Sequence, residues 1–471
     1  MGLSGEPVIG STNESAASRV PLPVIAREWA RIGGIGFGGP PAHISLLRKL
    51  CVERHQWLSA DEFEDGVATT NLLPGPASTQ LAIFCAWRLG GPVGAIVGGA
   101  CFIVPGLIVI LALSTLFLAT HPPLWVKGAA AGAGAAVPAV ALQAALGLAP
   151  ASWRRATSQP SQAAPAQPSQ AAPAQPSQAA HARPSPQPAS APPPAVDRRR
   201  HRIRPGWPGV RWFAYLVAGG VAGALAGPFL VVVLAACGAI ELGFRTHSIR
   251  HRIDGPRIIR FRIIRNRTGS GTGTDTGPLS RAMLPLALAV PVAAGGILSV
   301  AWVAFKVGAL SYGGGFVIIP LMQHDVVHTY HWMTGTQFLS AVALGQVTPG
   351  PVVQTVAVVG YAAAGVGGGL LASFVAFLPS FVFVLVGAPR FGLLRRNSGV
   401  QAFLTGAGPA AIGAIAGSTI PLGLELAHLW QLALLGLDLI WLLAFRKNVV
   451  AAIVGAAGLG IIAVLAGAPV G

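Results

Sequence analysis

The sequence predicts an all-α, polytopic membrane protein made of two homologous halves that are inverted relative to each other and contain broken or re-entrant helices. Hydrophobic residues make up 53% of the 471 residues and charged residues only 10%, whereas soluble domains carry about 25% charged residues. One motif occurs twice along the chain. The loops that follow its two copies carry different numbers of basic residues, which indicates opposite orientations in the membrane.

The repeated motif combines a glycine pair, two aromatic residues and a Pro-Gly-Pro triplet. Its second copy lies 275 residues after the first throughout. The paired positions are Gly38, Gly39, Trp57, Phe63, Pro74, Gly75 and Pro76 with Gly313, Gly314, Trp332, Phe338, Pro349, Gly350 and Pro351. A period of this length indicates a duplicated domain and excludes a short solenoid repeat.

Apolar tracts identify the membrane segments. Six of them reach or approach the roughly 20 residues that a helix needs to cross a bilayer, near residues 89–118, 122–149, 282–305, 363–388, 400–422 and 448–467. A Pro-Gly-Pro triplet breaks an ordinary helix, so we expect the segments before the tracts at 89 and 363 to be broken or re-entrant. Paired discontinuous helices of this kind are typical of secondary transporters.

Composition also divides the chain. We expect a polar N-terminal tail (1–20), a first repeat (21–150), a disordered Pro/Ala/Gln linker with a basic end (151–210), a helical hairpin with a basic cytoplasmic loop (211–281) and a second repeat (282–471). The linker is too rich in proline and too poor in apolar residues to pack.

The basic residues report orientation and do not indicate nucleic acid binding. Much of the net charge of +17 lies in two arginine-rich stretches that flank the hairpin, as the positive-inside rule expects for cytoplasmic loops in contact with membrane lipid. Arg48, Lys49 and Arg54 follow the first glycine motif, whereas residues 323–336 contain no lysine or arginine. We therefore expect these two loops on opposite sides of the membrane.

The glycine segments are candidate anion sites. Glycine lets backbone amides approach an anion, and the equivalent cations Arg31 and Lys306 precede the glycine pairs in the two halves. Two alternatives remain open from the residues alone. The glycines can serve close helix packing, and the cations can extend to the membrane interface.

Polar side chains in the membrane segments supply further candidates. Asn71 and Gln346 occupy equivalent positions before the triplets and can hydrogen-bond the unwound backbone or a ligand, although a purely structural kink is an equal alternative. Asp438 lies in an apolar run and is a candidate for proton coupling, with pairing to another helix as the alternative. His324, His328 and His331 are a weaker candidate for a metal site, because such histidines more often lie at the interface.

These motifs, in this order in both halves, resemble the chromate ion transporter (CHR) family in its long, two-domain form. The resemblance implies a transporter, not an enzyme, that exports chromate across the bacterial cytoplasmic (inner) membrane and gives chromate resistance without a cofactor or bound metal. Sulfate or other oxyanion uptake, and a membrane scaffold or sensor, are the alternatives, and a homodimer is the candidate assembly. The expected substrate-binding residues are Arg31, Gly38, Gly39, Pro40, His43, Asn71, Pro74, Gly75, Pro76, Lys306, Gly313, Gly314, Gln346, Pro349, Gly350 and Pro351.

Overall fold

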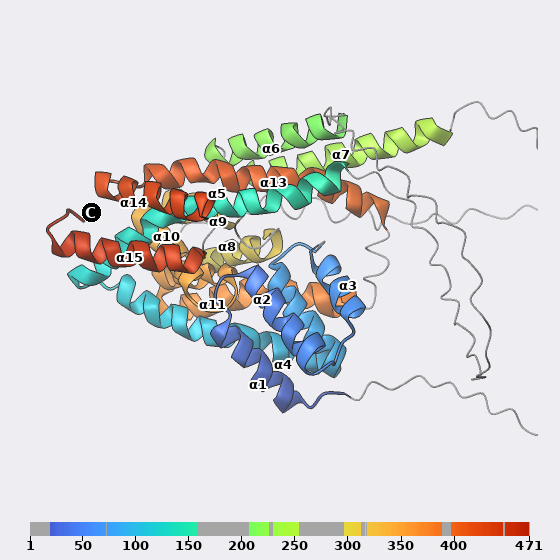
Figure 1. Cartoon of the computed structure of the whole chain (residues 1–471), viewed down its shortest axis with the longest axis horizontal. Helices are drawn as coiled ribbons and strands as arrows, with labels where there is room; N and C mark the ends of the chain where they lie inside the picture. The colour runs from blue at the N-terminus through green and yellow to red at the C-terminus, as the bar shows by residue number, and fades with distance from the viewer. Residues whose placement is uncertain are drawn as a thin grey trace, which may run out of the picture.

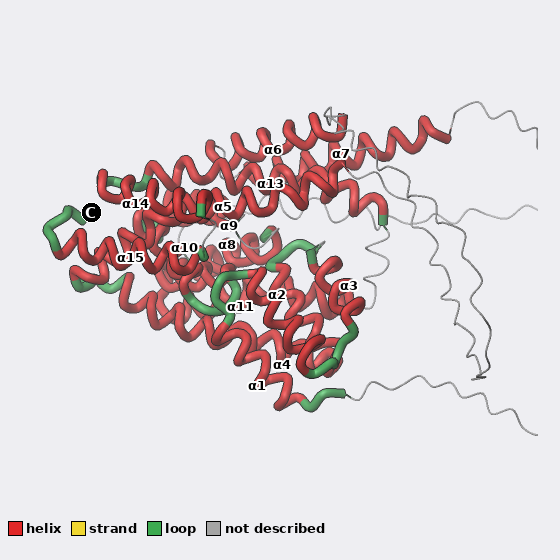
Figure 2. The backbone as a smooth tube through the Cα atoms, viewed as in Figure 1, coloured by secondary structure: helices red, strands yellow, loops and turns green. Residues whose placement is uncertain are grey.

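The computed structural model describes residues 19–71, 73–157, 207–225, 229–253, 296–311, 316, 318–388, 397–445 and 448–470, and every regular element in these ranges is a helix (Figure 2). Within them, the helices that are long and apolar enough to cross a membrane are Ala77–Phe117, Leu124–Thr157, Val352–Gly387 and Ser398–Leu424. Shorter apolar helices accompany them. The predicted all-α, multi-pass class is confirmed.

The two halves repeat the same order of elements (Figure 1). The first half comprises α1 (Leu22–Ile35), α2 (Pro40–Arg48), the π-helical turn η1 (Lys49–Arg54), α3 (Ala60–Thr70), α4 (Ala77–Phe117) and α5 (Leu124–Thr157). The second comprises α8 (Ile297–Leu310), α9 (Ile318–Gln323), the π-helical turn η3 (His324–Thr329), α10 (Gly335–Val347), the short 3₁₀ turn η4 (Val352–Gln354), α11 (Thr355–Gly387) and α13 (Ser398–Leu424). The sequence repeat is therefore also a structural repeat.

The correspondence extends to single backbone details. Ser59 and Thr334 are equivalent, and each begins its helix with a capping box, closed by Glu62 in α3 and by Gln337 in α10. A capping box satisfies two of the amides that a helix start leaves without partners. The two halves thus begin their third helices by the same local chemistry.

Both Pro-Gly-Pro triplets are the tips of re-entrant hairpins. Helix α3 ends at Thr70 and α4 begins at Ala77, just after the first triplet. Helix α4 then doubles back at Gly91 (φ 65°, ψ −158°), and a Cβ on Gly94 would lie 2.6 Å from the Ala86 carbonyl oxygen. In a straight helix those residues would be about 12 Å apart at 1.5 Å per residue. The prediction of broken segments is confirmed here.

The second half turns back in the same way. Helix α11 leaves helical geometry at Ala364 and Gly365 (φ 62°). A Cβ on Gly360 would lie 2.3 Å from the carbonyl oxygen of Gly368. We call Pro74-Gly75-Pro76 the first tip and Pro349-Gly350-Pro351 the second tip.

A terminal hairpin follows each half and covers the other half. Helices α6 (Trp207–Leu225) and α7 (Leu230–Ile253), which follow α5, pack on α13. Helices α14 (Leu429–Leu439) and α15 (Val449–Leu465), joined by the π-helical turn η6 (Ile440–Ala444), follow α13 and pack on α5 (Figure 1). This exchange holds the two halves together as one bundle.

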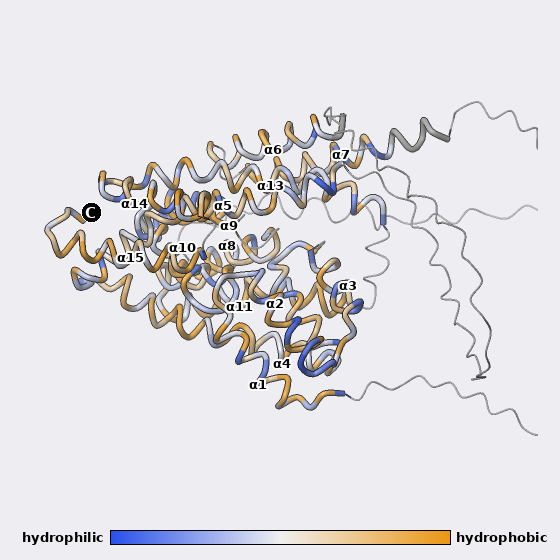
Figure 3. The backbone as a smooth tube through the Cα atoms, in the orientation of Figure 1, coloured by the Kyte–Doolittle hydropathy of each residue, from blue (hydrophilic) through white to orange (hydrophobic). Residues whose placement is uncertain are grey.

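Polar residues gather at one end of the bundle, around α3 (Figure 3). Arg48 pairs with Glu64, and Arg88 pairs with Glu62. Burial raises the pKa of Glu62, but hydrogen bonding to Ser59 and the positive charge of Arg88 outweigh it and hold that pKa below its usual value. The acidic side chains Glu62 and Glu64 of α3 therefore belong to an ion-paired surface. The predicted N-terminal tail, linker and second basic stretch lie almost entirely outside the described residues.

Candidate functional site

The two tips each bond to the opposite half. The Gly75 amide donates to the Ser311 carbonyl at the end of α8, at 2.7 Å, and the Gly350 amide donates to the Gly36 carbonyl at the end of α1, at 3.1 Å. Gly36 and Ser311 are equivalent positions. The central junction of the protein is therefore a pair of equivalent hydrogen bonds between the halves.

Glycine is required at both tips. The φ angles of Gly75 and Gly350 are 116° and 98°, in a region that residues with a Cβ rarely adopt. The flanking prolines fix φ near −65° and remove amide donors, so the triplets hold an open turn instead of continuing a helix. This local geometry places the Gly75 and Gly350 amides where the opposite half can accept from them.

His43 is part of this junction and is fully buried. Its Nε2 lies 2.9 Å from the Gly36 carbonyl oxygen, and its Nδ1 lies 3.3 Å from the Ser78 hydroxyl. Since a carbonyl can only accept, Nε2 carries the proton and Nδ1 accepts from Ser78. His43 therefore fastens α2 to α1 and α4, and the Gly36 carbonyl that it contacts also receives the Gly350 amide.

The first glycine motif shapes the start of α2. Gly38 and Gly39 have φ angles of 98° and 72°, and Pro40 and Pro41 then begin the helix. These two prolines carry no N–H, and the next amide, of Ala42, already donates to the Gly39 carbonyl. This helix start offers an anion its dipole but few amide donors. The equivalent Gly313 and Gly314 lie outside the described residues.

The two predicted cations have different surroundings. Lys306 pairs with the Asp325 carboxylate and lies 5.8 Å from the ring centre of Trp302, while Arg31 is exposed on α1. Neither side chain is among the lining residues of the two cavities described below. The structure therefore does not show the expected pair of cations at one anion site.

Buried hydroxyl groups surround the first tip instead. A Cβ on Gly75 would lie 3.2 Å from the Ser380 hydroxyl of α11. The hydroxyls of Ser380, Ser311 and Thr79 are wholly buried, and none has a hydrogen-bond partner among the described residues. Thr79 lies in the first turn of α4, directly after the tip.

Buried hydroxyls are normally satisfied, so these three are candidate donors to a ligand, although none of them lines the cavity beside the first tip. Sequence reasoning missed Ser380. The available signal was a serine directly after Pro379 inside an apolar run.

The second tip differs from the first. Gly106 of α4 occupies the place of Ser380, and a Cβ there would lie 2.2 Å from the Pro349 carbonyl oxygen. Gln354 donates from Nε2 to the Ile103 carbonyl at 2.6 Å. Gln346, the counterpart of Asn71, is buried with its Nε2 atom lacking a partner in the described structure. The second tip is closely packed against α4 and lacks a hydroxyl at the position that corresponds to Ser380.

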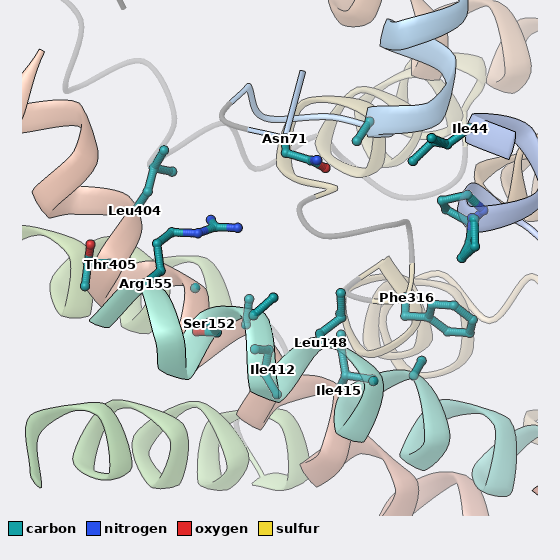
Figure 4. Close-up of a pocket in the computed structure, with 18 residues that line it drawn as sticks. Ile44, Asn71, Leu148, Ser152, Arg155, Phe316, Leu404, Thr405, Ile412 and Ile415 are labelled. Carbon is teal, nitrogen blue, oxygen red and sulfur yellow. The ribbon is translucent and has the colours of Figure 1, made fainter. Parts of the chain in front are cut away.

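A cavity of about 390 Å³ lies beside the first tip (Figure 4). Pro40 and Asn71, two of the predicted residues, line it together with Ala77 at the start of α4. Helices α5 and α13 form the opposite wall. Pro40 and Asn71 thus share this cavity, whereas Gly38, Gly39 and the residues of the second tip are not among its described lining.

The remaining candidates lie away from the tips. Asp438 is 5% exposed on α14, which packs on α5, and its Oδ2 atom has no partner among the described residues. His324 and His328 lie 5.8 Å apart between ring centres, but Asp325 is engaged by Lys306. No group of three or more metal-ligating side chains occurs in the part of the chain that the structure describes.

Comparison with known proteins agrees with the repeat. The model of a family described as "Chromate transporter" matches residues 24–242 and 298–461. The chain is 29% identical over 438 residues to the "Chromate transport protein" of Cupriavidus metallidurans, covering 92% of this chain and 91% of that protein. It is 26% identical to the "Probable chromate transport protein" of Synechococcus elongatus, covering 88% of each chain. No solved structure matches the chain significantly.

Proposed function

Because the chain belongs to the chromate transporter family, we propose that it is a secondary active transporter that exports chromate across the bacterial cytoplasmic membrane and so gives chromate resistance. The observation that carries the proposal is the group of buried hydroxyls of Ser380, Ser311 and Thr79 at the first tip. Hydroxyl donors can replace part of the water shell of a tetrahedral oxyanion. They carry no net charge and therefore allow its release, as transport requires.

The direction follows from the charge of the substrate. A dianion leaving a cell with a negative interior moves down the electrical potential, which supplies roughly 4.6 kcal/mol per 100 mV for two charges. Uptake of the same ion would have to overcome that energy. The membrane potential therefore favours export for chromate and equally for sulfate, which has the same charge and nearly the same shape.

Asp438 is the candidate for proton coupling. It is a buried carboxyl whose Oδ2 atom has no partner in the described structure, and an ionisable group within an apolar helix is a functional candidate by default. A carboxyl that binds and releases a proton during the cycle would link chromate movement to the proton gradient.

Everted membrane vesicles test the proposal. When respiration energises them, their interior becomes positive and acidic, so vesicles that contain the protein should accumulate chromate. Vesicles without it should not, and excess sulfate in the same assay reports selectivity. Failure to accumulate chromate, or movement of sulfate alone, would contradict chromate export. If Asp438 couples protons, Asp438→Asn should keep accumulation driven by the membrane potential but lose the part driven by the pH gradient.

A further inference from the structure

The cavity beside the first tip contains a cation, Arg155, that belongs to none of the repeated motifs. Arg155 lies in the last turn of α5, and Figure 4 shows its side chain extending into the open space below Asn71. No aspartate or glutamate is among the described residues that line this cavity. The described lining is therefore mostly apolar, and its one charged side chain is an arginine, which favours an anion over a cation.

Other groups around the cavity suit an anion. Ala77 is the first residue of α4 and lies at the positive end of the helix dipole, where the Thr79 and Gln80 amides already donate to the Pro76 carbonyl. The hydroxyls of Ser152 and Thr405 and the amide of Asn71 also line the space. A guanidinium offers up to five N–H donors in a planar fork that matches oxyanions. The site thus has charge, donors and room for one small oxyanion.

A second cavity lies at the other end of α5. Its volume is about 270 Å³, and Lys127, in the first turn of the helix, is among its lining residues. The described residues of this lining also include no aspartate or glutamate, and Thr336 and Gln337 of α10 contribute to it. Each end of α5 therefore places one cation in a cavity whose described lining includes no acidic side chain.

The two cavities occupy places that the repeat relates. From the Gly91 and Gly365 turns onward, equivalent positions of the two halves are 274 residues apart. Leu404, Thr405 and Gly408 of α13 line the first cavity, and their counterparts on α5, which are Ala130, Ala131 and Gly134, line the second. The distance between the two cavities along α5 is long enough for them to open on opposite sides of the membrane. Lys127 and Arg155 are separated by roughly 40 Å along a helix that rises 1.5 Å per residue, whereas the hydrocarbon core is about 30 Å thick.

We propose that Arg155 and Lys127 are the anion-attracting residues at the two mouths of one translocation path along α5. Arg155 binds the oxyanion entering from the cytoplasm, next to the first tip, and Lys127 binds it on the external side. The inference rests on the proposed transport of chromate. It does not assign this role to Arg31 or Lys306, because neither side chain lines either of these two cavities.

The test measures chromate flux from each side with single variants. Arg155→Gln should raise the KM for entry from the cytoplasmic face, measured in everted vesicles, by about tenfold or more, the equivalent of about 1.4 kcal/mol. Arg155→Lys should recover part of that loss, because it restores the charge without the fork. Arg154→Gln is the matched control, because it removes the same charge from the same helical turn and the Arg154 side chain does not line the cavity. The KM of this variant should stay within twofold of the wild-type value.

Lys127→Gln should have the opposite sidedness. It should raise the KM for chromate entering right-side-out vesicles in an exchange assay and leave the KM at the cytoplasmic face within twofold of the wild-type value. Elution as a single species of unchanged size, with the wild-type melting temperature, shows that each variant folds.

The outcomes separate this inference from the proposed function. A wild-type protein that moves no chromate defeats the proposed function itself. If the wild type transports chromate while folded Arg155→Gln shows an unchanged cytoplasmic KM, the assignment of Arg155 is wrong and chromate transport stands. Equal effects of Arg154→Gln and Arg155→Gln would also overturn it, because only the general surface charge would then matter.

Discussion

Ser380 is the side chain whose role at the first tip depends most on the fold. Its hydroxyl faces Gly75 from the opposite half and lacks a partner among the described residues. The prolines indicate the two tips in the sequence. Nothing in the sequence places Ser380 beside the first tip, because that position depends on the packing of α11 against α4. Arg155 was missed for the same reason, since its cavity is formed by helices that lie far apart in the chain.

The hydroxyls at the first tip yield a direct prediction. Ser380→Ala should lower kcat/KM for chromate by about fivefold, because one hydrogen bond is worth about 1 kcal/mol. Loss of protein stability should be small, since the hydroxyl satisfies no protein partner. Flux in vesicles and melting of the purified protein measure the two effects.

Ser114→Ala is the matched control for this prediction. Ser114 is also wholly buried, but its hydroxyl donates to the Ile110 carbonyl of its own helix at 2.7 Å. The control should transport chromate like the wild type. A Ser380→Ala protein with unchanged kcat/KM would contradict a substrate contact at the first tip.

The re-entrant hairpins show how far sequence reasoning reaches at the level of elements. The two Pro-Gly-Pro triplets predict broken helices, and the structure confirms the breaks between Thr70 and Ala77 and between Val347 and Val352. The sharp return at Gly91 was not predicted. Gly91 lies inside a long apolar run that is also compatible with a straight span, and only its contacts with the preceding turn distinguish the two.

The glycines of the first motif divide between two roles. Gly33 and Gly308 are equivalent positions. A Cβ on Gly33 would lie 2.3 Å from the Phe102 carbonyl oxygen of α4, and a Cβ on Gly308 would lie 1.9 Å from the Ala376 carbonyl oxygen of α11. These two therefore serve close helix packing, the alternative that the sequence left open. Gly39, by contrast, sets the backbone turn into α2 with its φ of 72°.

Substitution of the packing glycines should act on stability. Gly308→Ala should destabilise the protein by about 1–3 kcal/mol, because the added methyl group forces α8 away from α11. The melting temperature in detergent measures this effect. Gly367→Ala, at a glycine with open space around it, is the control and should leave the melting temperature nearly unchanged. Equal melting temperatures for both variants would show that α8 and α11 are not in close contact.

The exchange of terminal hairpins joins the two halves into one bundle. Helices α6 and α7 cover α13, while α14 and α15 cover α5, so neither half is complete without the other. From this pairing we infer that the repeating unit extends beyond the boundary expected near residue 150 and includes the hairpin that follows. Sequence reasoning treated that hairpin as a separate segment because its counterpart, α14 and α15, shares no motif with it.

Loop charge and the two cavities both favour an inverted arrangement of the halves. Glu53 and His328 are equivalent exposed positions in the loops that follow the two glycine motifs. The first loop is rich in arginine and lysine, whereas the described residues of the second contain neither. An inverted repeat places two such positions on opposite sides of the membrane.

Labelling of single cysteines at these two positions tests the inversion most directly. In a background with the four native cysteines replaced, a membrane-impermeant maleimide should label His328→Cys in intact cells and Glu53→Cys only in everted vesicles. Both variants must also transport chromate. Labelling of both positions from the same side would contradict the inverted arrangement of the two halves.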